Sequence, residues 1–412
     1  MHKFSLRARW VLPVAGPPIA GGVVSVQAGQ IVGIDAPATS SLETIDLGDV
    51  VLMPGLVNAH THLEFSDLPR PVGKPGMALP EWIRLVIGER NRSNRNPREA
   101  VAQGLVESLR SGVTTLGEIA NLPLSVYADL PGPSRTIFQE VIGFSAARCD
   151  SVLSDLKSRL NSSNIRAAEH LVGISPHAPY TVHPNLLRQL VSLAQQRHIP
   201  LAMHLAESRE ELELLATGSG PFQELLDQRG MWDPGAISLG STVLDYLRVL
   251  ADAPRSLVIH GNYLSEAEIE FLGQRRDFMS VVYCPRTHAY FGHPPYPLEK
   301  LLKSGVRVAL GTDSRASNPD LGLLGEMRFV AKRFPNLPPE SILNMGTQWG
   351  AEALGLADQT GLLSVGQWAD LVALACPAGV DPHEAILHGF EEPCRVFFRG
   401  EECEQVISGN NH

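Results

Sequence analysis

Two histidines separated by one residue, His60 and His62, close an apolar run in the segment PGLVNAHTH (54–62). In a β-strand, residues i and i+2 point to the same face, so both imidazoles can reach one metal ion. Imidazole is a ligand of zinc and iron, and a bound metal can start hydrolytic chemistry. Taken alone, such a pair is more often two ordinary polar residues that close a strand, and the rest of the chain reverses this preference.

Four further ionisable residues stand at the ends of apolar runs, namely His204, Glu207, His260 and Asp313. If these runs are parallel strands of one barrel, the residues at their carboxyl ends lie together on one rim. Each residue also has an ordinary explanation: Glu207 could begin a solvated helix, His260 could be a packed core residue, and Asp313 could cap a helix. Their recurrence at successive strand ends favours one shared site.

Three imidazoles and one carboxylate can hold a divalent ion and leave a position for water, as a catalytic site requires. Such an ion lowers the pKa of its water from about 15.7 to about 7, which corresponds to roughly 12 kcal/mol. We expect Glu207 to carry a proton to a leaving or ring nitrogen, His260 to orient the hydroxide, and Asp313 also to accept the water proton. The expected metal ligands are His60, His62, His204 and Asp313.

From residue 54 onward, apolar runs alternate with amphipathic segments such as 97–111 and 185–197. This alternation is typical of parallel βαβ units. Eight strands are predicted, and they end near His62, Leu116, Val141, His177, His204, His260, Cys284 and Asp313. The sequence therefore predicts an α/β fold, a (β/α)₈ barrel of the TIM type.

Both ends of the chain are richer in short strand-like segments, for example 22–26 and 30–34 near the start. Segments 370–374 and 395–398 follow the turn-rich stretch 361–366 near the end. We expect the two ends to build one small β-sandwich domain. The predicted division is 1–53 for its N-terminal part, 54–360 for the barrel and 361–412 for its C-terminal part.

The composition narrows the class of partner. The chain has 412 residues and a formal net charge of -10, and it lacks a Lys/Arg run, which argues against nucleic acid and anionic membranes. Its five cysteines form no CxxC pair, so we expect reduced thiols and a cytoplasmic location. Prolines near the N-terminus interrupt any signal or membrane helix. A small-molecule substrate is expected, and a homodimer only because dimers are the commonest assembly.

With these residues in place, the chain resembles the amidohydrolase superfamily, within it the branch of cytosine-deaminase-like and chlorohydrolase-like enzymes. The resemblance implies one zinc ion, or alternatively iron, bound by the four ligands named above, with Glu207 and His260 serving in proton transfer and hydroxide activation. The matching segments are PGLVNAHTH (54–62), SPHAPYTVHP (175–184), MHLAES (203–208), LGTDSRASN (310–318), EMR (326–328) and GQWADLV (366–372).

Two features of the resemblance concern the number of metals and the substrate. Dinuclear superfamily members usually bridge their metals with a carboxylated lysine from strand four, and the segment 174–180 contains no lysine. A single metal is therefore expected. In the deaminase branch the residue matching His177 contacts substrate; its alternative here is a packed polar residue before Pro179.

The chain departs from many relatives after strand seven, where CPRTHAYF (284–291) replaces an Asn-Pro-x-Ser-Asn stretch. We expect His288 in this loop to contact substrate. Arg286 and Arg315 place two guanidinium groups near the predicted mouth, where they would suit a carboxylate or phosphate. Alternatively, they pair with acidic residues of neighbouring loops.

The segments that contain Glu64 and Trp82 are similar to those of aminofutalosine deaminases, which hydrolyse an adenine-type amine on a nucleoside that bears a benzoate. Both residues are expected to contact substrate, although a core role is the commoner fate of such a tryptophan.

The predicted function is hydrolytic deamination of an aminated heterocycle, an adenine-type nucleoside such as 6-amino-6-deoxyfutalosine, by metal-hydroxide attack with release of ammonia. The nearby alternative is a chlorohydrolase or cyclic-amide hydrolase of the same superfamily. The distant alternative is a barrel scaffold without catalytic activity, against which the retention of every expected ligand argues.

Overall fold

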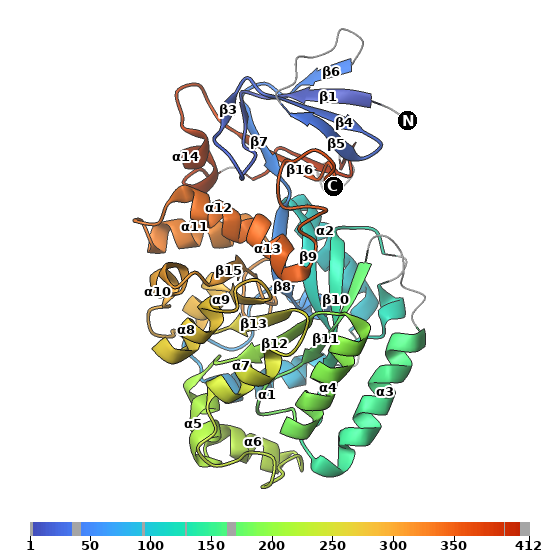
Figure 1. The fold of residues 1–412 in the computed structure, drawn as a ribbon, viewed down its shortest axis with the longest axis vertical. Coiled ribbons are helices and arrows are strands. Elements are labelled where there is room, and N and C mark those ends of the chain that lie inside the picture. The colour runs from blue at the N-terminus through green and yellow to red at the C-terminus, as the bar shows by residue number, and fades with distance from the viewer. Residues whose placement is uncertain are drawn as a thin grey trace.

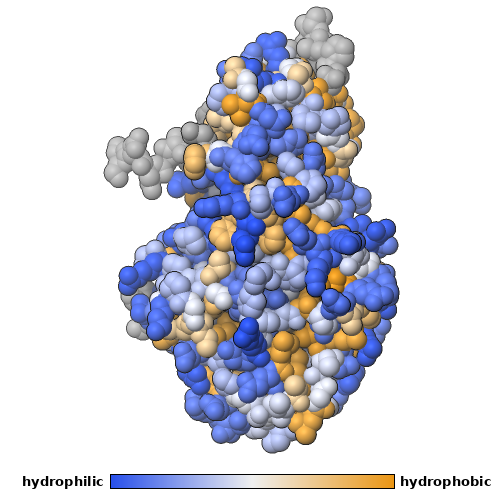
Figure 2. Space-filling view, turned by 90° about the vertical axis from the view of Figure 1, so that its left-hand side faces the viewer, coloured by the Kyte–Doolittle hydropathy of each residue, from blue (hydrophilic) through white to orange (hydrophobic). Residues whose placement is uncertain are grey.

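The computed structural model describes residues 3–34, 43–92, 95–127, 130–162, 170–390 and 392–403. They form a large barrel lobe and a smaller β lobe, and the first and last described strands both lie in the smaller lobe (Figure 1). Hydrophilic residues cover most of the face seen in Figure 2.

The barrel consists of eight strands that are paired in parallel in the order of the sequence. A bridge between Thr61, at the end of the first strand, and Asp313, just after the last strand, closes the barrel. This arrangement confirms the predicted (β/α)₈ fold. The strands are β8 (Leu56–Thr61), β9 (Val113–Ala120), β10 (Ser134–Val141), β11 (His170–Pro176), β12 (Leu201–Leu205), β13 (Ser256–His260), β14 (Met279–Tyr283) and β15 (Arg307–Leu310).

Helices surround the barrel, and their buried apolar side chains pack against its strands. No helix in the described part of the chain is both long and apolar enough to cross a membrane. The α-helices are α1 (Leu79–Arg90), α2 (Pro97–Arg110), α3 (Cys149–Ser162), α4 (Pro184–Arg197), α5 (Arg209–Thr217), α6 (Pro221–Gln228), α7 (Val243–Leu250), α8 (Glu266–Gly273), α9 (Pro285–Phe291), α10 (Leu298–Lys303), α11 (Leu323–Arg333), α12 (Pro339–Gly346), α13 (Gln348–Leu354) and α14 (Pro382–Leu387), and the 3₁₀ turns are η1 (Leu63–Phe65), η2 (Leu124–Val126) and η3 (Ala146–Arg148).

The smaller lobe contains two sheets built from both ends of the chain. Leu6, Leu52, Leu371 and Phe397 belong to one buried apolar cluster between them, as expected for a β-sandwich. One sheet has the order β5 (Gln30–Ile34), β4 (Val23–Gln27), β1 (Lys3–Arg7), β6 (Glu43–Asp46), and the other β18 (Glu401–Glu402), β17 (Arg395–Phe398), β16 (Leu371–Ala375), β7 (Val50–Pro54), β2 (Trp10–Val11), β3 (Ile19–Ala20).

The limits of the predicted domains remain a proposal. Strand β7 pairs with β16 in the smaller lobe and leads directly into β8 of the barrel. A boundary near residue 54 is therefore compatible with the structure. The C-terminal part was predicted to reach residue 412, and residues 404–412 lie outside the described residues.

One strand is longer than predicted. The sequence predicts an end near Leu116, whereas β9 continues to Ala120. Gly117 resembles a strand terminator, but a Cβ at this position would lie 2.6 Å from the carbonyl oxygen of Ala59. The glycine therefore permits close approach of the β8 backbone and does not end the strand.

Helix α13 packs across the end of the barrel opposite the strand termini that carry the histidines. Its residues Ala351, Ala353 and Leu354 share a buried cluster with Val57 and Ile259 from the barrel interior. Apolar packing thus fills this end, so a substrate must enter at the carboxyl ends of the strands.

Candidate active site

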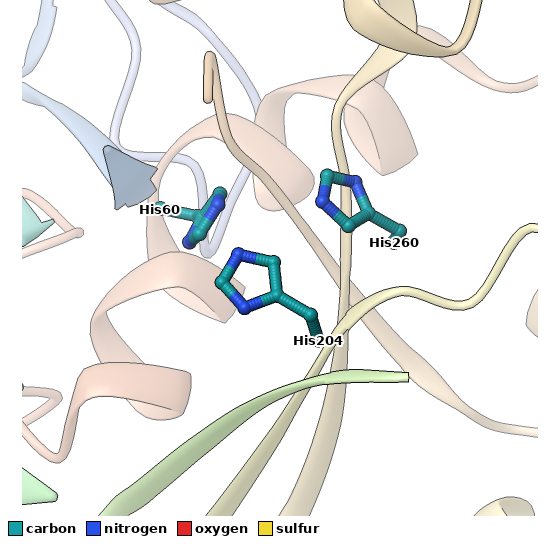
Figure 3. A group of neighbouring side chains, drawn as sticks. All are labelled: His60, His204 and His260. Atoms are coloured by element: carbon teal, nitrogen blue, oxygen red, sulfur yellow. The ribbon is translucent and has the colours of Figure 1, made fainter. Parts of the chain in front are cut away.

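Three imidazoles from three different strand ends converge inside the barrel rim. Figure 3 shows the rings of His60, His204 and His260 turned toward one another. Their ring centroids are 5.0 Å apart for His60 and His204, 5.6 Å for His60 and His260, and 5.5 Å for His204 and His260. One nitrogen from each ring lies within 4.8 Å of the others, which is close enough for one ion to reach all three.

A second group shares His60 and adds His62 and Asp313. The Nε2 atoms of both histidines lie 3.7 Å from Asp313 Oδ1, and His62 Nε2 lies 3.3 Å from His204 Nε2. All five side chains therefore face one small space. The alternation along β8 explains why His60 and His62 share a face.

Local backbone strain accompanies this convergence. Ala206, His260 and Asp313 stand at or just after the ends of β12, β13 and β15 and have φ angles of 55°, 70° and 60°. Residues with a side chain rarely adopt this left-handed region, at a cost of about 1–3 kcal/mol each. Such strain is concentrated at functional sites, and here it turns the chain sharply where each strand presents its polar residue.

The electrostatics of the histidines suit metal binding. Burial, together with neighbouring imidazoles, lowers the pKa of His60, His62 and His260 well below the usual range and that of His204 to about 4. All four are therefore neutral at pH 7, the form that ligates metals. Both ring nitrogens of His60 and Nδ1 of His62 are buried without a hydrogen-bond partner. Unsatisfied buried nitrogens that face a carboxylate fit a site for a divalent cation.

Hydrogen bonds within the protein orient two side chains of this group, His204 and Asp313. His204 Nδ1 lies 3.0 Å from the backbone oxygen of His177, which directs Nε2 toward the site. Asp313 accepts hydrogen bonds from the backbone N–H of Ser314 (2.7 Å) and the hydroxyl of Ser317 (2.9 Å). These contacts hold both side chains before any ligand arrives.

Glu207 stands beside this group and is suited to proton transfer. Its Oε1 lies 3.4 Å from His260 Nε2. Burial, with the nearby Asp313 and Glu211 carboxylates, raises the pKa of Glu207 well above its usual range. A carboxylic acid with a raised pKa can both donate and accept a proton near neutral pH. The alternative of a solvated helix start does not hold, because Glu207 is buried.

Glu211 fixes the position of Glu207 through the backbone. The buried Glu211 carboxylate accepts hydrogen bonds from the N–H groups of Ala206 (2.8 Å) and Glu207 (2.9 Å). Ser208 caps helix α5 by accepting from the N–H of Glu211 (3.2 Å). The left-handed turn at Ala206 is thus tied to the first turn of the helix.

Replacing Glu211 by Gln should therefore lower the turnover number about 10-fold or more and leave bound metal unchanged. A glutamine side chain has one acceptor oxygen, so one buried N–H loses its partner, at about 1–3 kcal/mol. Steady-state kinetics and elemental analysis measure the two effects. Glu213→Gln, at an exposed position on the same helix, is the matched control. Unchanged kinetics in the Glu211 variant would show that the carboxylate does not position Glu207.

A cavity of about 340 Å³ opens beside the converging groups. Two residues predicted to contact substrate, His177 and Trp82, line it. His177 Nδ1 lies 2.7 Å from the hydroxyl of Thr181, and burial lowers the pKa of His177 to about 3, so the imidazole is neutral. Most of the remaining wall is apolar, formed by Phe65, Leu79, Ile83, Val86, Ile87, Ile142, Leu225, Leu226 and Met231.

The two predicted anion-binding arginines have other partners. Arg286 donates to Asp320 (2.7 Å) and Glu326 (2.6 Å), and Arg315 donates to Glu107 (2.7 Å). Neither arginine is among the residues that line the cavity. Both arginines therefore pair with carboxylates of other segments, which is the alternative stated for them in the sequence analysis.

Glu64 and His288 also lie outside the cavity lining of the described chain. Glu64 is buried and accepts hydrogen bonds from Arg90 (2.7 Å) and Asn121 (3.0 Å). His288 packs against the rings of Tyr283 and Tyr296, with centroids 5.7 Å and 5.6 Å away. Glu64 is linked to the cavity through Arg90, which lines it, and the predicted substrate contacts of Glu64 and His288 remain predictions.

The sequence reasoning missed two buried glutamates near the site. Glu140 at the end of β10 lines the cavity. Glu118 on β9 accepts two hydrogen bonds from the N–H of Leu63 (3.1 and 3.0 Å), one from Thr61 (2.9 Å) and one from Tyr127 (2.9 Å), and so holds the turn after His62. A search for acidic residues at every strand end would have found Glu140.

Comparison with known proteins places the chain in a family. A 5-methylthioadenosine/S-adenosylhomocysteine deaminase of Syntrophobacter fumaroxidans is 30% identical over 386 residues, 88% of this chain and 80% of that protein. An aminodeoxyfutalosine deaminase of Nitratiruptor sp. is 27% identical, with 85% of this chain and 86% of that protein covered.

Solved structures agree in fold. Helicobacter pylori aminofutalosine deaminase in complex with methylthio-coformycin superposes with a TM-score of 0.84 at 24% identity, covering 97% of this chain and 99% of that one. An adenosine deaminase from Xanthomonas campestris with bound zinc gives 0.75 at 25% identity, covering 97% and 92%. The amidohydrolase family model matches residues 51–403, and the chain therefore belongs to the amidohydrolase family.

Proposed function

We propose that this protein is a mononuclear-metal hydrolase that deaminates an adenine-type nucleoside with release of ammonia. The observation that carries the proposal is the convergence of four neutral imidazoles, Asp313 and the protonatable Glu207 on one face of a cavity. Relatives named as deaminases of 5-methylthioadenosine, S-adenosylhomocysteine and aminodeoxyfutalosine support an adenine-type amine as the group removed.

The residues that would hold the metal are His60, His62, His204 and Asp313. Their unsatisfied nitrogens and mutual distances suit a single ion. A bound divalent ion supplies a hydroxide nucleophile at neutral pH. Zinc is the proposed ion, since the Xanthomonas campestris relative has bound zinc, and iron accepts the same ligand types.

The side chains around this set have separate proposed tasks. Glu207, which is held beside His260, delivers a proton to the ring nitrogen next to the carbon under attack. It then takes up the proton of the added hydroxyl and passes it to the departing amine, and the water proton accepted by Asp313 restores Glu207 for the next turnover. His260 donates a hydrogen bond where negative charge develops, and Asp313 accepts the proton of the attacking water. His177 and Trp82 orient the heterocycle from the cavity wall.

The cavity suits a small organic substrate with a large apolar surface, because most of its wall is apolar. 6-Amino-6-deoxyfutalosine is the narrower proposal and rests on the similarity to the Nitratiruptor protein. A cytoplasmic location and a homodimer are further proposals from the composition and from the frequency of dimers.

Product analysis on a substrate panel tests the function. The panel contains adenosine, 5-methylthioadenosine, aminodeoxyfutalosine, a chlorotriazine and a cyclic amide. We expect ammonia and a 6-oxo product from at least one adenine-type nucleoside, and neither chloride nor an opened ring from the last two compounds. Chloride release or ring opening without ammonia would favour the chlorohydrolase or cyclic-amide alternative. Failure of the protein to retain a transition metal that is supplied to it, together with the absence of product from every compound of the panel, would favour a scaffold.

A further inference from the structure

Glu140 is a buried carboxylate in the cavity wall that the reaction described above does not use. It is the second-last residue of β10, and its side chain is 3% exposed. A cavity-facing carboxylate at such low exposure requires hydrogen-bond donors. The donors that surround it therefore determine what it can bind.

The protein provides few donors to this carboxylate. Burial raises the pKa of Glu140, while the nearby Arg90 charge, His204 and the Asn121 amide act in the opposite direction. Among the described residues, Asn121 is the hydrogen-bonding neighbour that favours the ionised form. Both neighbours are shared, since Arg90 and Asn121 also donate to Glu64. A carboxylate can accept about four hydrogen bonds, so most of the capacity of Glu140 remains for a ligand.

The position of Glu140 relative to the metal-side residues indicates which part of a ligand it meets. His177 stands between them: its ring centroid is 5.1 Å from that of His204, and its Nε2 is 3.9 Å from Glu140 Oε1. In an adenine-type nucleoside the amine and the sugar lie at opposite ends of the purine. With the amine beside Glu207, a residue one side chain beyond His177 is placed to meet the sugar.

The surrounding wall also favours hydroxyl groups as the partners. Ile142, two residues further along the chain, and the other apolar residues of the lining cannot accept a hydrogen bond from a sugar. A carboxylate accepts from two neighbouring hydroxyls at once and forms stronger hydrogen bonds than a neutral group. Buried hydroxyls without such a partner would bind poorly.

Resting on the proposed function, we propose that Glu140 accepts hydrogen bonds from the sugar hydroxyls of the nucleoside and determines the preference for ribonucleosides. It is a specificity residue in this account and takes no part in proton transfer to the purine. Substrates that lack the hydroxyls would leave the carboxylate unpaired, and the enzyme would discriminate against them.

The test compares adenosine with 2′,3′-dideoxyadenosine in wild-type protein and in Glu140→Gln and Glu140→Leu variants. In wild type, kcat/KM should favour adenosine by about 10- to 100-fold, the range for hydrogen bonds to a charged group. The ratio should fall in the Gln variant, which keeps one acceptor oxygen, and approach one in the Leu variant. Most of the change should appear as a higher KM for adenosine.

Glu118→Gln is the matched control, because Glu118 is also a buried glutamate but lies outside the described cavity lining. It should lower activity on both substrates alike and leave their ratio unchanged. A ratio that stays at the wild-type value in both Glu140 variants would overturn the role of Glu140 and leave the proposed function standing. Failure of wild-type protein to release ammonia from any nucleoside would overturn both.

Discussion

Replacing Glu207 by Gln should lower the rate of ammonia release by about 10²- to 10⁴-fold, the usual contribution of a positioned proton donor and acceptor. The amide has nearly the same shape but cannot carry a proton between water and the heterocycle. Because Glu207 is not among the proposed ligands, metal content should not change. Single-turnover kinetics with a nucleoside substrate and elemental analysis of the same samples measure both quantities.

Exposed Glu213, on the helix that follows, provides a control for this experiment. Glu213→Gln should match wild type in rate and metal content. Full activity in Glu207→Gln, with one equivalent of metal retained, would remove Glu207 from the mechanism. Loss of metal together with activity would instead indicate that Glu207 helps to hold the ion.

Asp313→Ala should lose both bound metal and activity. Asp313 contributes the carboxylate of the proposed ligand set and lies 3.7 Å from the Nε2 atoms of His60 and His62. Residues that merely orient a ligand affect metal affinity by about 10- to 100-fold, so removal of the ligand itself should exceed that range. Metal titration monitored by calorimetry measures the affinity, and ammonia release measures the activity.

A second variant separates metal binding from folding. The amide oxygen of Asn can still accept the hydrogen bond from the N–H of Ser314, and its NH2 group can donate to the hydroxyl oxygen of Ser317, but the side chain lacks the negative charge. Asp313→Asn should therefore keep the unfolding temperature of the metal-free protein while binding metal weakly. Exposed Asp358→Ala is the surface control. One equivalent of tightly bound metal in an active Asp313 variant would contradict the ligand assignment.

The barrel and the convergence of the polar strand ends could be predicted because both depend on patterns local in the sequence. Apolar runs that alternate with amphipathic segments define parallel strands, and parallel strands bring their carboxyl ends to one rim. The sequence therefore predicts that His60, His204, His260 and Asp313 lie together, and the distances agree.

The substrate contacts were harder to predict because they depend on partners far away in the chain. Arg286 resembles an anion-binding residue until Asp320 and Glu326 are seen to pair with it. Nothing near Glu107 in the sequence indicates that it meets Arg315. The left-handed backbone conformations of Ala206 and Asp313 could not be predicted from the sequence either, because glycine is the usual residue in that conformation.

The most direct test of the central claim is the ratio of ammonia released to nucleoside consumed by protein loaded with increasing metal. The account predicts one ammonia and one 6-oxo product per nucleoside, with a rate that rises until one equivalent of metal is bound and then stays constant. A rate that continues to rise to two equivalents would contradict the mononuclear site. Consumption of nucleoside without ammonia, at any metal loading, would contradict deamination itself.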